Sequence, residues 1–276
     1  MRGQCMAGGA AMARTGSEDT LAQGSFVRAL RAEALKSRHG APVRLAIVLA
    51  LPFPLLAAFV ALSVPQFGLS YSPWNYWYAL LMPVSITLIA ATVANADARL
   101  GNHTLLSSGV PLHLAWGAKV AWCLALLLLS NLVVFAVYAV MSLVVPQGAA
   151  SMSAMLAVAL ALTVMGSWMI PATHLLTMRV GMLAGVFVPL AVQLALSLGW
   201  SVVPFWPACP PAATIVLPTA FLPVLPSGEP ASPGMALVES ISQGPDVALA
   251  LIVAAVLTAA LTAAGAVWLD RSEELR

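Results

Sequence analysis

Histidine and cysteine, the side chains that most often do chemistry, are few in this sequence and widely separated. They are His39, His103, His113, His174, Cys5, Cys123 and Cys209. The spacing between His103 and His113 matches no familiar metal-ligand pattern. An odd, dispersed set of cysteines gives no disulfide framework. We therefore expect no metal site and no catalytic group among them, and we expect the cysteines to fill space as small apolar residues.

Sequence motifs for self-contained catalysis are also missing. The chain has no Gly-x-x-x-x-Gly-Lys-Ser/Thr phosphate loop, so it cannot bind and hydrolyse ATP in that way. It also lacks His-Glu-x-x-His and the Gly-x-Ser-x-Gly nucleophile elbow. We expect this chain to be no enzyme and to carry no cofactor. If it moves a substrate, the energy should come from a partner protein.

Six apolar runs account for most of the sequence, of which 61% is hydrophobic and only 8% charged. Each run is about 20 residues long or slightly longer, the length at which an α-helix crosses a bilayer. None has an ionisable group near its centre, where ion-coupled pumps usually need one. The sequence thus predicts an all-α integral membrane protein with spans at 45–64, 77–96, 120–145, 152–170, 180–200 and 247–269.

The most polar residues in the middle of these spans are Asn131 and Gln193. Hydrogen bonding between helices is the favoured role for both, ahead of contact with a substrate. Gly181 and Gly185 give a Gly-x-x-x-Gly spacing at the start of the fifth run, which permits close helix contact but is a weak signal in a chain so rich in small residues.

The basic residues predict the orientation of the six spans. If the spans alternate in direction, every Lys and Arg falls on one side of the membrane. The only charged residues in the connections on the other side are then Glu229, Glu239 and Asp246. Because cytoplasmic segments retain the positive charge, both termini should be cytoplasmic. The net charge of +2 therefore reflects this asymmetry, and we do not read it as nucleic-acid affinity.

The segment before the first span has two parts. Residues 1–24 lack an apolar run, and we expect a disordered leader or an over-extended start with translation beginning at Met6 or Met12. Ser25–His39 can place Phe26, Leu30 and Leu35 on one face, surrounded by charges that include Arg31, Glu33 and Lys36. An interfacial helix on the inner membrane surface is favoured; a flanking basic anchor that only sets orientation is the alternative.

The longest connection on the basic side, Asp97–Ala118, mixes leucines with polar residues and is broken at Gly109-Val110-Pro111. A loop with this much apolar surface must lie in the membrane interface or be covered by another protein. We favour docking of a partner protein here.

Two features mark the opposite side. Tyr71, Trp74, Tyr76, Trp77 and Tyr78 gather where the second span begins, and an aromatic belt at the lipid headgroups is favoured over a peptide-binding role. The loop 201–246 holds ten prolines, so it cannot form one continuous helix. It could be a disordered outer loop. Its apolar pieces Val202–Trp206 and Thr214–Val224 favour short re-entrant or interfacial segments that pack back on the bundle.

In their order and spacing, several of these segments resemble the membrane subunits of lantibiotic-immunity ABC transporters. The resemblance covers about Ser25 to the C-terminus and rests on four stretches: Glu33 with Lys36; Trp74-Asn75-Tyr76-Trp77-Tyr78 followed by Pro83; Thr104 to Pro111 with Trp116-Gly117-Ala118-Lys119; and Phe205-Trp206-Pro207-Ala208-Cys209-Pro210-Pro211. The chain departs from the family in its leader and in the length and proline content of its last outer loop.

The resemblance implies a permease of the type 2 ABC-exporter architecture in a bacterial cytoplasmic membrane. Two permeases, identical or related, would sit on two copies of a separate ATP-binding subunit that carries ATP and Mg, and would expel a hydrophobic or amphipathic peptide. It further implies an elbow helix with Arg31, Glu33 and Lys36, and an ATPase-coupling loop between the second and third spans. The candidate coupling residues are Asp97, Arg99, His103, Leu105, Leu106, Ser107 and Pro111, and the candidate substrate or belt residues are Trp74, Asn75, Trp77, Tyr78 and Trp206. A membrane scaffold or immunity protein that binds peptide or lipid without ATP is the alternative.

Overall fold

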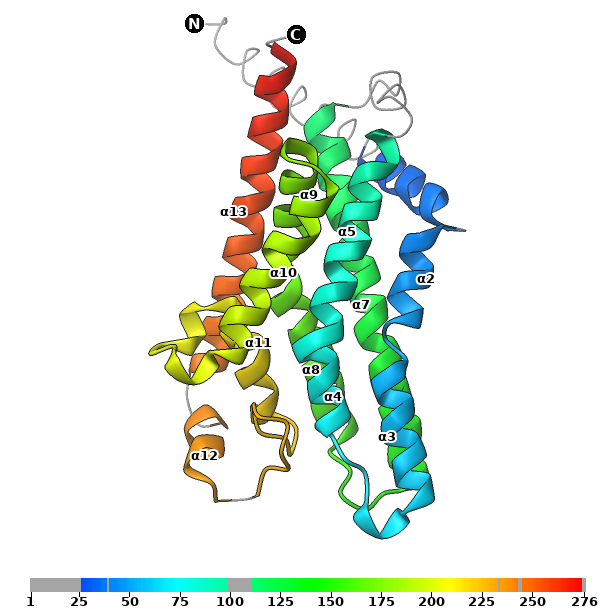
Figure 1. The fold of residues 1–276 in the computed structure, drawn as a ribbon, viewed down its shortest axis with the longest axis vertical. Coiled ribbons are helices and arrows are strands. Elements are labelled where there is room, and N and C mark those ends of the chain that lie inside the picture. Colours follow the sequence, from blue (N-terminus) through cyan, green and yellow to red (C-terminus); the bar gives the residue numbers. More distant parts are fainter. Residues whose placement is uncertain (1–25, 39, 99–110, 233, 243–244, 275–276) are drawn as a thin grey trace, which may run out of the picture.

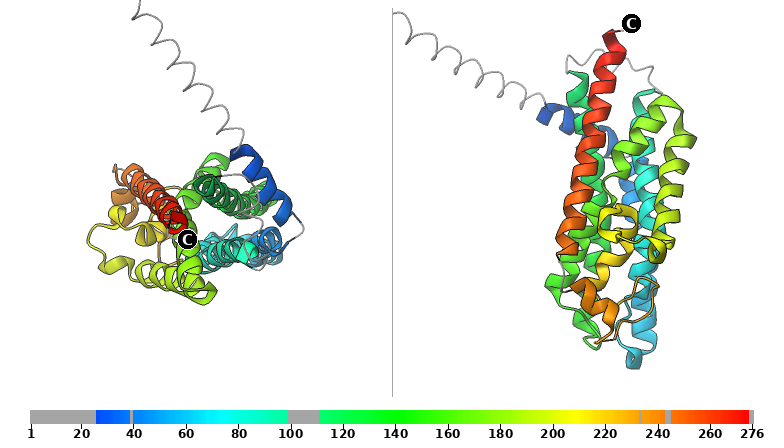
Figure 2. Two further views of the ribbon diagram at one scale, coloured as in Figure 1. Left: turned by 90° about the horizontal axis from the view of Figure 1, so that it is seen from above. Right: turned by 90° about the vertical axis from the view of Figure 1, so that its left-hand side faces the viewer.

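Long apolar helices, aligned side by side, make up the fold (Figure 1). The computed structural model describes residues 26–38, 40–98, 111–232, 234–242 and 245–274. Residues 26–37 form a helix that lies across the bundle rather than along it, as Figure 2 shows from above. The predicted leader at 1–24 and most of the predicted coupling loop lie outside the described residues.

Proline positions explain where the first two long helices change direction. The first consists of α2 (Ala41–Val48) and α3 (Pro52–Ser63), which are separated by a break just before Pro52 and Pro54. Proline has no N–H to donate and its ring clashes with the carbonyl group four residues earlier, so a break at this point is expected. The second consists of α4 (Ser72–Tyr76), the π-helix η2 (Trp77–Leu81) and α5 (Met82–Ala98), and the π-turn ends two residues before Pro83.

Two of the long helices, α7 and α8, form a hairpin. Helix α7 (Leu112–Val144) and α8 (Met152–Gly166) are joined by a turn at residues 145–151, in which Gly148 adopts a φ of +76°. Ser151 caps α8 through a hydrogen bond that the Ala154 N–H donates to its hydroxyl. Helix α9 (Met169–Arg179) continues the direction of α8 after a short break, which lies where the Pro171 ring would meet the Ser167 carbonyl.

The chain then reverses at Gly181, whose φ of +120° suits glycine, and α10 (Met182–Leu198) packs against α9 and α5. The proline-rich segment that follows is folded. It contains the short helices η3 (Trp200–Val202), η4 (Trp206–Ala208), α11 (Pro210–Val216), η5 (Leu217–Ala220) and α12 (Ala236–Ser242). Every residue of α11 is buried, among α8, α10 and α13 (Asp246–Glu274). Of the two apolar pieces expected to pack back on the bundle, Thr214–Val224 does so and is mostly buried, whereas Val202 and Phe205 of the other piece are 80% and 54% exposed.

The described residues contain five helices that are long enough and apolar enough to cross a membrane: Ala41–Ser63, Ser72–Ala96, Leu112–Val144, Met152–Arg179 and Asp246–Arg271. The apolar run expected as the fifth of six spans corresponds to α10, which is apolar but has only 17 residues. Several helices extend beyond the expected runs, since α7 begins at Leu112 rather than Val120 and α9 continues to Arg179 rather than ending at Ile170. The described residues are thus all-helical in architecture, and α5 contacts α2, α7, α8, α9 and α10.

A glycine permits a close contact between α9 and α10. A Cβ atom on Gly185 would collide with the Thr177 hydroxyl, and it would also lie 2.9 Å from the Thr177 nitrogen and 3.0 Å from the Thr173 carbonyl oxygen. Gly185 is thus the residue of the Gly-x-x-x-Gly pair that lets the two helices approach, whereas Gly181 forms the turn.

We predict that Gly185→Ala lowers stability by about 1–3 kcal/mol, the usual cost of overfilling a well-packed contact. The thermal midpoint of the detergent-solubilised protein measures this effect. Gly117→Ala is the matched control, because a Cβ atom there would meet only the Phe26 ring, at 3.6 Å. Equal midpoints for the two variants would contradict the close contact between α9 and α10.

Candidate functional site

The two ends of the bundle differ in charge. We call the end that holds the helix at 26–37, the start of α7 and the end of α13 the basic end (Figure 1). The described Lys and Arg residues lie on segments that meet there: Arg28, Arg31, Lys36, Arg38, Arg44, Lys119, Arg179 and Arg271. Glu229, Glu239 and Asp246 lie on the loop, α12 and the start of α13 at the opposite end.

A buried ion pair fastens the helix at 26–37 to the bundle. The Nζ atom of Lys119, on α7, lies 3.2 Å from Oε1 of Glu33, and both side chains are only 8% exposed. Lys36 Nζ approaches the same oxygen at 2.9 Å from the more exposed side. One carboxylate therefore joins two ammonium groups, one on its own helix and one on α7. Arg31, the third predicted elbow residue, is exposed.

The face that this helix buries is more polar than the sequence indicated. Phe26 and Leu30 are partly buried, Glu33 and Ser37 are fully buried, and Leu35 is 60% exposed. The expectation that Leu35 shares a face with Phe26 and Leu30 was therefore wrong. At 100° per residue, Leu35 lies on the opposite side of the helix from Phe26, whereas Glu33 and Ser37 fall on the same stripe. The helix contacts α7 through its charged pair as well as through apolar contact.

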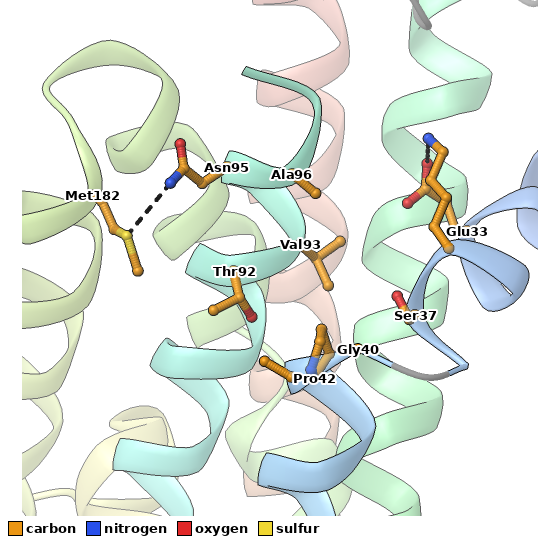
Figure 3. Close-up of a pocket in the computed structure, with 11 residues that line it drawn as sticks. Glu33, Ser37, Gly40, Pro42, Thr92, Val93, Asn95, Ala96 and Met182 are labelled. Atoms are coloured by element: carbon orange, nitrogen blue, oxygen red, sulfur yellow. Dashed lines mark hydrogen bonds and ion pairs between the residues drawn. The ribbon is translucent and has the colours of Figure 1, made fainter. Parts of the chain in front are cut away.

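Next to this ion pair is a pocket of about 400 Å³ (Figure 3). Its walls come from the end of the helix at 26–37, the start of α2, the last turns of α5 and Met182 at the start of α10. Glu33 and Ser37 line one side, and Thr92 and Asn95 of α5 line the other. Asn95 Nδ2 donates a hydrogen bond to Met182 Sδ, 3.6 Å away. The pocket is amphipathic, because alanine, proline, valine and methionine complete its lining.

The C-terminal helix is also fixed at the basic end. Trp116 Nε1 donates a hydrogen bond to the Thr262 carbonyl oxygen at 2.9 Å, and the Arg179 guanidinium lies 4.6 Å from the centre of the Trp268 ring. His113 Nδ1 and Asp270 Oδ1 are 3.8 Å apart in a more exposed contact. These contacts join α7 and α9 to α13 close to where α7 begins.

The predicted coupling residues fall at the edge of the described structure. Arg99, His103, Leu105, Leu106 and Ser107 lie outside the described residues. Asp97 is in the last turn of α5, and Pro111 is the exposed residue that precedes α7. The described parts thus place both ends of this loop at the basic end of the bundle (Figure 1).

At the opposite end, the aromatic group expected as a belt lies mostly inside the bundle. Trp74, Trp77 and Tyr78 are fully buried, and Tyr76 alone of the group is exposed, at 44%. The Trp74 and Tyr138 ring centres are 4.6 Å apart, and those of Tyr71 and Tyr138 are 5.2 Å apart. Trp74, Trp77 and Tyr78 thus form core rather than a headgroup belt. Trp74 packs against Tyr138 of α7, and Trp77 donates a hydrogen bond to Asn131 of the same helix. Trp206 is partly buried and packs on a separate apolar cluster around α11 and α13.

The polar residues within the spans make hydrogen bonds between helices. Asn131 accepts a hydrogen bond from Trp77 Nε1 at 3.1 Å and donates one to the Thr163 hydroxyl at 3.1 Å, so it links η2, α7 and α8. This confirms the favoured role of Asn131. Gln193 Nε2 donates to Ser197 at 2.8 Å and lies 3.4 Å from the Pro211 carbonyl oxygen of α11. Gln193 therefore helps hold the proline-rich segment against α10.

Asn75 fixes the outer loop to the start of the second long helix. Its Nδ2 group lies 2.8 Å from the Tyr78 hydroxyl, 3.3 Å from the Leu225 carbonyl oxygen and 3.4 Å from that of Pro226. The turn it holds is closed by a bridge between Val224 and Pro230 and contains Gly228 with a φ of +89°. A Cβ atom on Gly228 would come within 3.3 Å of Asn75 Oδ1, so glycine allows the close approach.

A second pocket, of about 210 Å³, lies beneath this turn. Asn75, Tyr76 and Trp200 line it together with apolar residues of η2, α10 and α11, and Pro226 and Ser227 of the turn close one side. Of the residues predicted for substrate contact, the structure brings Asn75 to a pocket and places Trp74, Trp77 and Tyr78 in the interior behind it.

Sequence reasoning missed Lys119 and Trp200. No partner was assigned to Lys119 from the sequence, although a lone lysine at the start of an apolar run is a signal for a buried partner. Nothing in the sequence connected Trp200 to Asn75. Among the described residues, no group of three or more His, Cys, Asp and Glu side chains could hold a metal ion. Cys123 Sγ and His174 Nε2 lie 3.6 Å apart, and the His174 ring also packs edge-on against Trp116, with ring centres 5.5 Å apart.

We predict that Glu33→Gln destabilises the protein by about 3 kcal/mol, since it removes the carboxylate beside a buried ammonium group. Glu33→Gln combined with Lys119→Met should recover part of that loss, because the buried charge is then gone as well. Thermal midpoints in detergent test both, with the exposed Arg31→Gln as control. A double variant no more stable than Glu33→Gln would contradict a coupled buried pair.

We also predict that Asn75→Leu releases the turn at 222–231 while leaving the rest of the fold in place. The substitution keeps the side-chain size but removes the amide donors, a loss of about 1–3 kcal/mol. Hydrogen exchange of the turn amides should become faster. Asn95→Leu, at the basic end, is the matched control and should leave exchange at 222–231 unchanged; an equal effect of the two variants would rule out a local fastening by Asn75.

No protein-family model, no curated protein and no solved structure matches this chain. Its function is therefore inferred from the geometry described above together with the sequence.

Proposed function

We propose that this chain is the permease subunit of an ABC transporter that expels a hydrophobic or amphipathic peptide, such as a lantibiotic, across a bacterial cytoplasmic membrane. In this proposal α10 completes six spans, both ends of the chain face the cytoplasm, and the basic end is the cytoplasmic end. The gathering of the described basic residues at one end supports this orientation, since positive charge is retained in the cytoplasm.

The observation that carries the proposal is the ion pair between Glu33 and Lys119. Helix α7 begins shortly after the loop at 99–110, and Lys119 lies two turns into it. Glu33 lies on the helix at 26–37, which crosses the bundle. A partner that pushes on the loop would thus move α7 and the helix at 26–37 together. This is the arrangement expected of a coupling loop and an elbow helix in a permease driven by a separate ATPase.

The opposite end supports a role in handling an apolar ligand. The pocket beneath the turn at 222–231 combines apolar walls with Asn75, Trp200 and the half-exposed Tyr76. Apolar pockets with a few polar groups are typical of sites that take amphipathic ligands. Glu229, Glu239 and Asp246 make this end mildly acidic, which would favour a cationic peptide.

The polar groups inside the described spans support an energy source outside the chain. The interior residues Asn131 and Gln193 make hydrogen bonds to neighbouring elements. Ion-driven transport usually relies on ionisable groups near the middle of the membrane, whereas the buried Lys119 and His174 lie towards the basic end, beside Glu33 and Trp116 respectively. An energy source outside the chain therefore suits the structure better.

The decisive experiment is a pull-down of the tagged full chain from membranes of its native host, with mass spectrometry of the partners and an ATPase assay of the eluate. We expect an ATP-binding subunit and a second permease in the eluate. Deletion of 107–111, or Arg99→Glu, should remove or uncouple the ATPase. Arg271→Glu is the matched control, because it makes the same charge reversal at the same end but outside the loop.

A chain that purifies alone and without ATPase activity would overturn the permease proposal. It would favour a membrane protein that binds peptide or lipid without ATP. Equal loss of ATPase in Arg99→Glu and Arg271→Glu would contradict coupling through the loop, while leaving the association with an ATPase in place.

A further inference from the structure

The pocket beneath the turn at 222–231 has the size of one aromatic side chain. Its volume is about 210 Å³. A cavity of ~150 Å³ holds a benzene molecule, whereas pockets for drug-sized ligands begin at ~300 Å³. The pocket therefore admits a single ring system. A peptide would place one side chain inside it and leave the rest of its length outside.

A buried amide oxygen in the lining lacks a hydrogen-bond donor. Asn75 is only 3% exposed, and its Nδ2 group is directed at the carbonyl oxygens of Leu225 and Pro226. Because only the amide nitrogen can donate to a carbonyl oxygen, these contacts fix Oδ1 as the atom on the other side of the amide. Among the described residues, no group donates a hydrogen bond to this oxygen. A ligand that supplies a donor here gains what a buried acceptor without a donor loses.

The rim of the pocket joins apolar and polar surface. Leu80 and Leu198 are exposed apolar residues on the helices beside it, whereas Ser227 is exposed on the turn. Trp and Tyr side chains suit such a boundary, because each combines a large apolar ring with one polar hydrogen. The same hydrogen is the donor that Asn75 Oδ1 lacks.

The charge next to the pocket is negative. Glu229 lies two residues after Ser227 on the same turn and is exposed. Glu239 on α12 and Asp246 at the start of α13 add negative charge to this end of the bundle, and the described Lys and Arg residues all lie on other segments. A basic residue next to the inserted ring would thus be attracted to the turn.

We propose that this pocket binds the side chain of a Trp or Tyr residue of a cationic amphipathic peptide. The ring packs against Ala79, Trp200 and Ile215, and its N–H or O–H group donates a hydrogen bond to Asn75 Oδ1. A Lys or Arg of the peptide lies near Glu229. That the ligand is a peptide rests on the proposed function, whereas the choice of side chain rests on the size of the pocket and on Asn75.

Binding of short peptides to the full chain in phosphatidylcholine nanodiscs tests the proposal. The probe is Lys-Trp-Lys amide made with fluorotryptophan, whose fluorine resonance should broaden with the protein and stay sharp with empty nanodiscs. Replacing the tryptophan by benzothienylalanine keeps the ring size but puts sulfur in place of the N–H group. This peptide should compete about five-fold more weakly, the effect of one hydrogen bond. Equal competition by the two peptides would contradict a hydrogen bond to Asn75.

Two pairs of variants locate the site on the chain. Ala79→Leu narrows the pocket and should abolish the broadening, whereas Ala195→Leu makes the same change at an exposed position of α10 outside the lining and should retain it. Glu229→Gln should weaken Lys-Trp-Lys about two-fold, as expected of an exposed charge, and Asp246→Asn is its control outside the turn. The comparison of the two peptides needs no variant, so it decides the question even if Ala79→Leu does not fold.

This inference and the proposed function can fail separately. Equal broadening with Ala79→Leu and Ala195→Leu, both folded, would overturn the pocket as the binding site even if the chain purifies with an ATPase. Binding that is lost in Ala79→Leu, in a chain that purifies without an ATPase, would support the pocket and overturn the permease.

Discussion

The basic end of the molecule depends on the ion pair between Glu33 and Lys119. A buried ammonium group such as that of Lys119 is costly unless an anion neutralises it, and Glu33 is the anion that the fold supplies. Because Glu33 belongs to the helix at 26–37, the requirement for neutrality also fixes where that helix lies. The helix in turn closes one side of the 400 Å³ pocket and sets the point at which α2 enters the bundle.

The opposite end is organised by neutral hydrogen bonds. Asn75 holds the turn at 222–231, Gln193 and Ser197 hold Pro211, and Asn131 joins three helical segments through Trp77 and Thr163. Amide and hydroxyl groups suit this role, since they lose less on leaving water than charged groups do. Ion pairs thus hold the basic end, whereas neutral amides and hydroxyls hold the opposite end. The proline-rich segment is folded because Asn75, Gln193 and Ser197 bond its carbonyl groups.

Much of this architecture could be predicted from the sequence, because length and apolar composition determine helices that cross a bilayer. The hydrogen-bonding role of Asn131 could be predicted because a polar group inside a span needs a hydrogen-bond partner. The packing of Thr214–Val224 on the bundle could be predicted because an apolar segment is stabilised by removal from water. The burial of Trp74 and Tyr78 did not follow, because an aromatic residue at the start of a span suits a belt and a core equally well. For Trp74 the deciding contact comes from Tyr138, far along the chain, whose ring centre lies 4.6 Å away. The contact between Glu33 and Lys119 likewise joins residues that no local pattern relates.

The π-helix at Trp77–Leu81 has a consequence for how the two ends are related. A π-turn accommodates one residue more than an α-helical turn over the same length, so it rotates everything before it by about 100° relative to everything after it. Asn75 precedes the π-turn, whereas Thr92 and Asn95 follow it. The π-turn therefore sets the direction in which Asn75 faces relative to α5. Deletion of one residue from Trp77–Leu81 would leave the basic end unchanged and turn Asn75 away from the loop it holds.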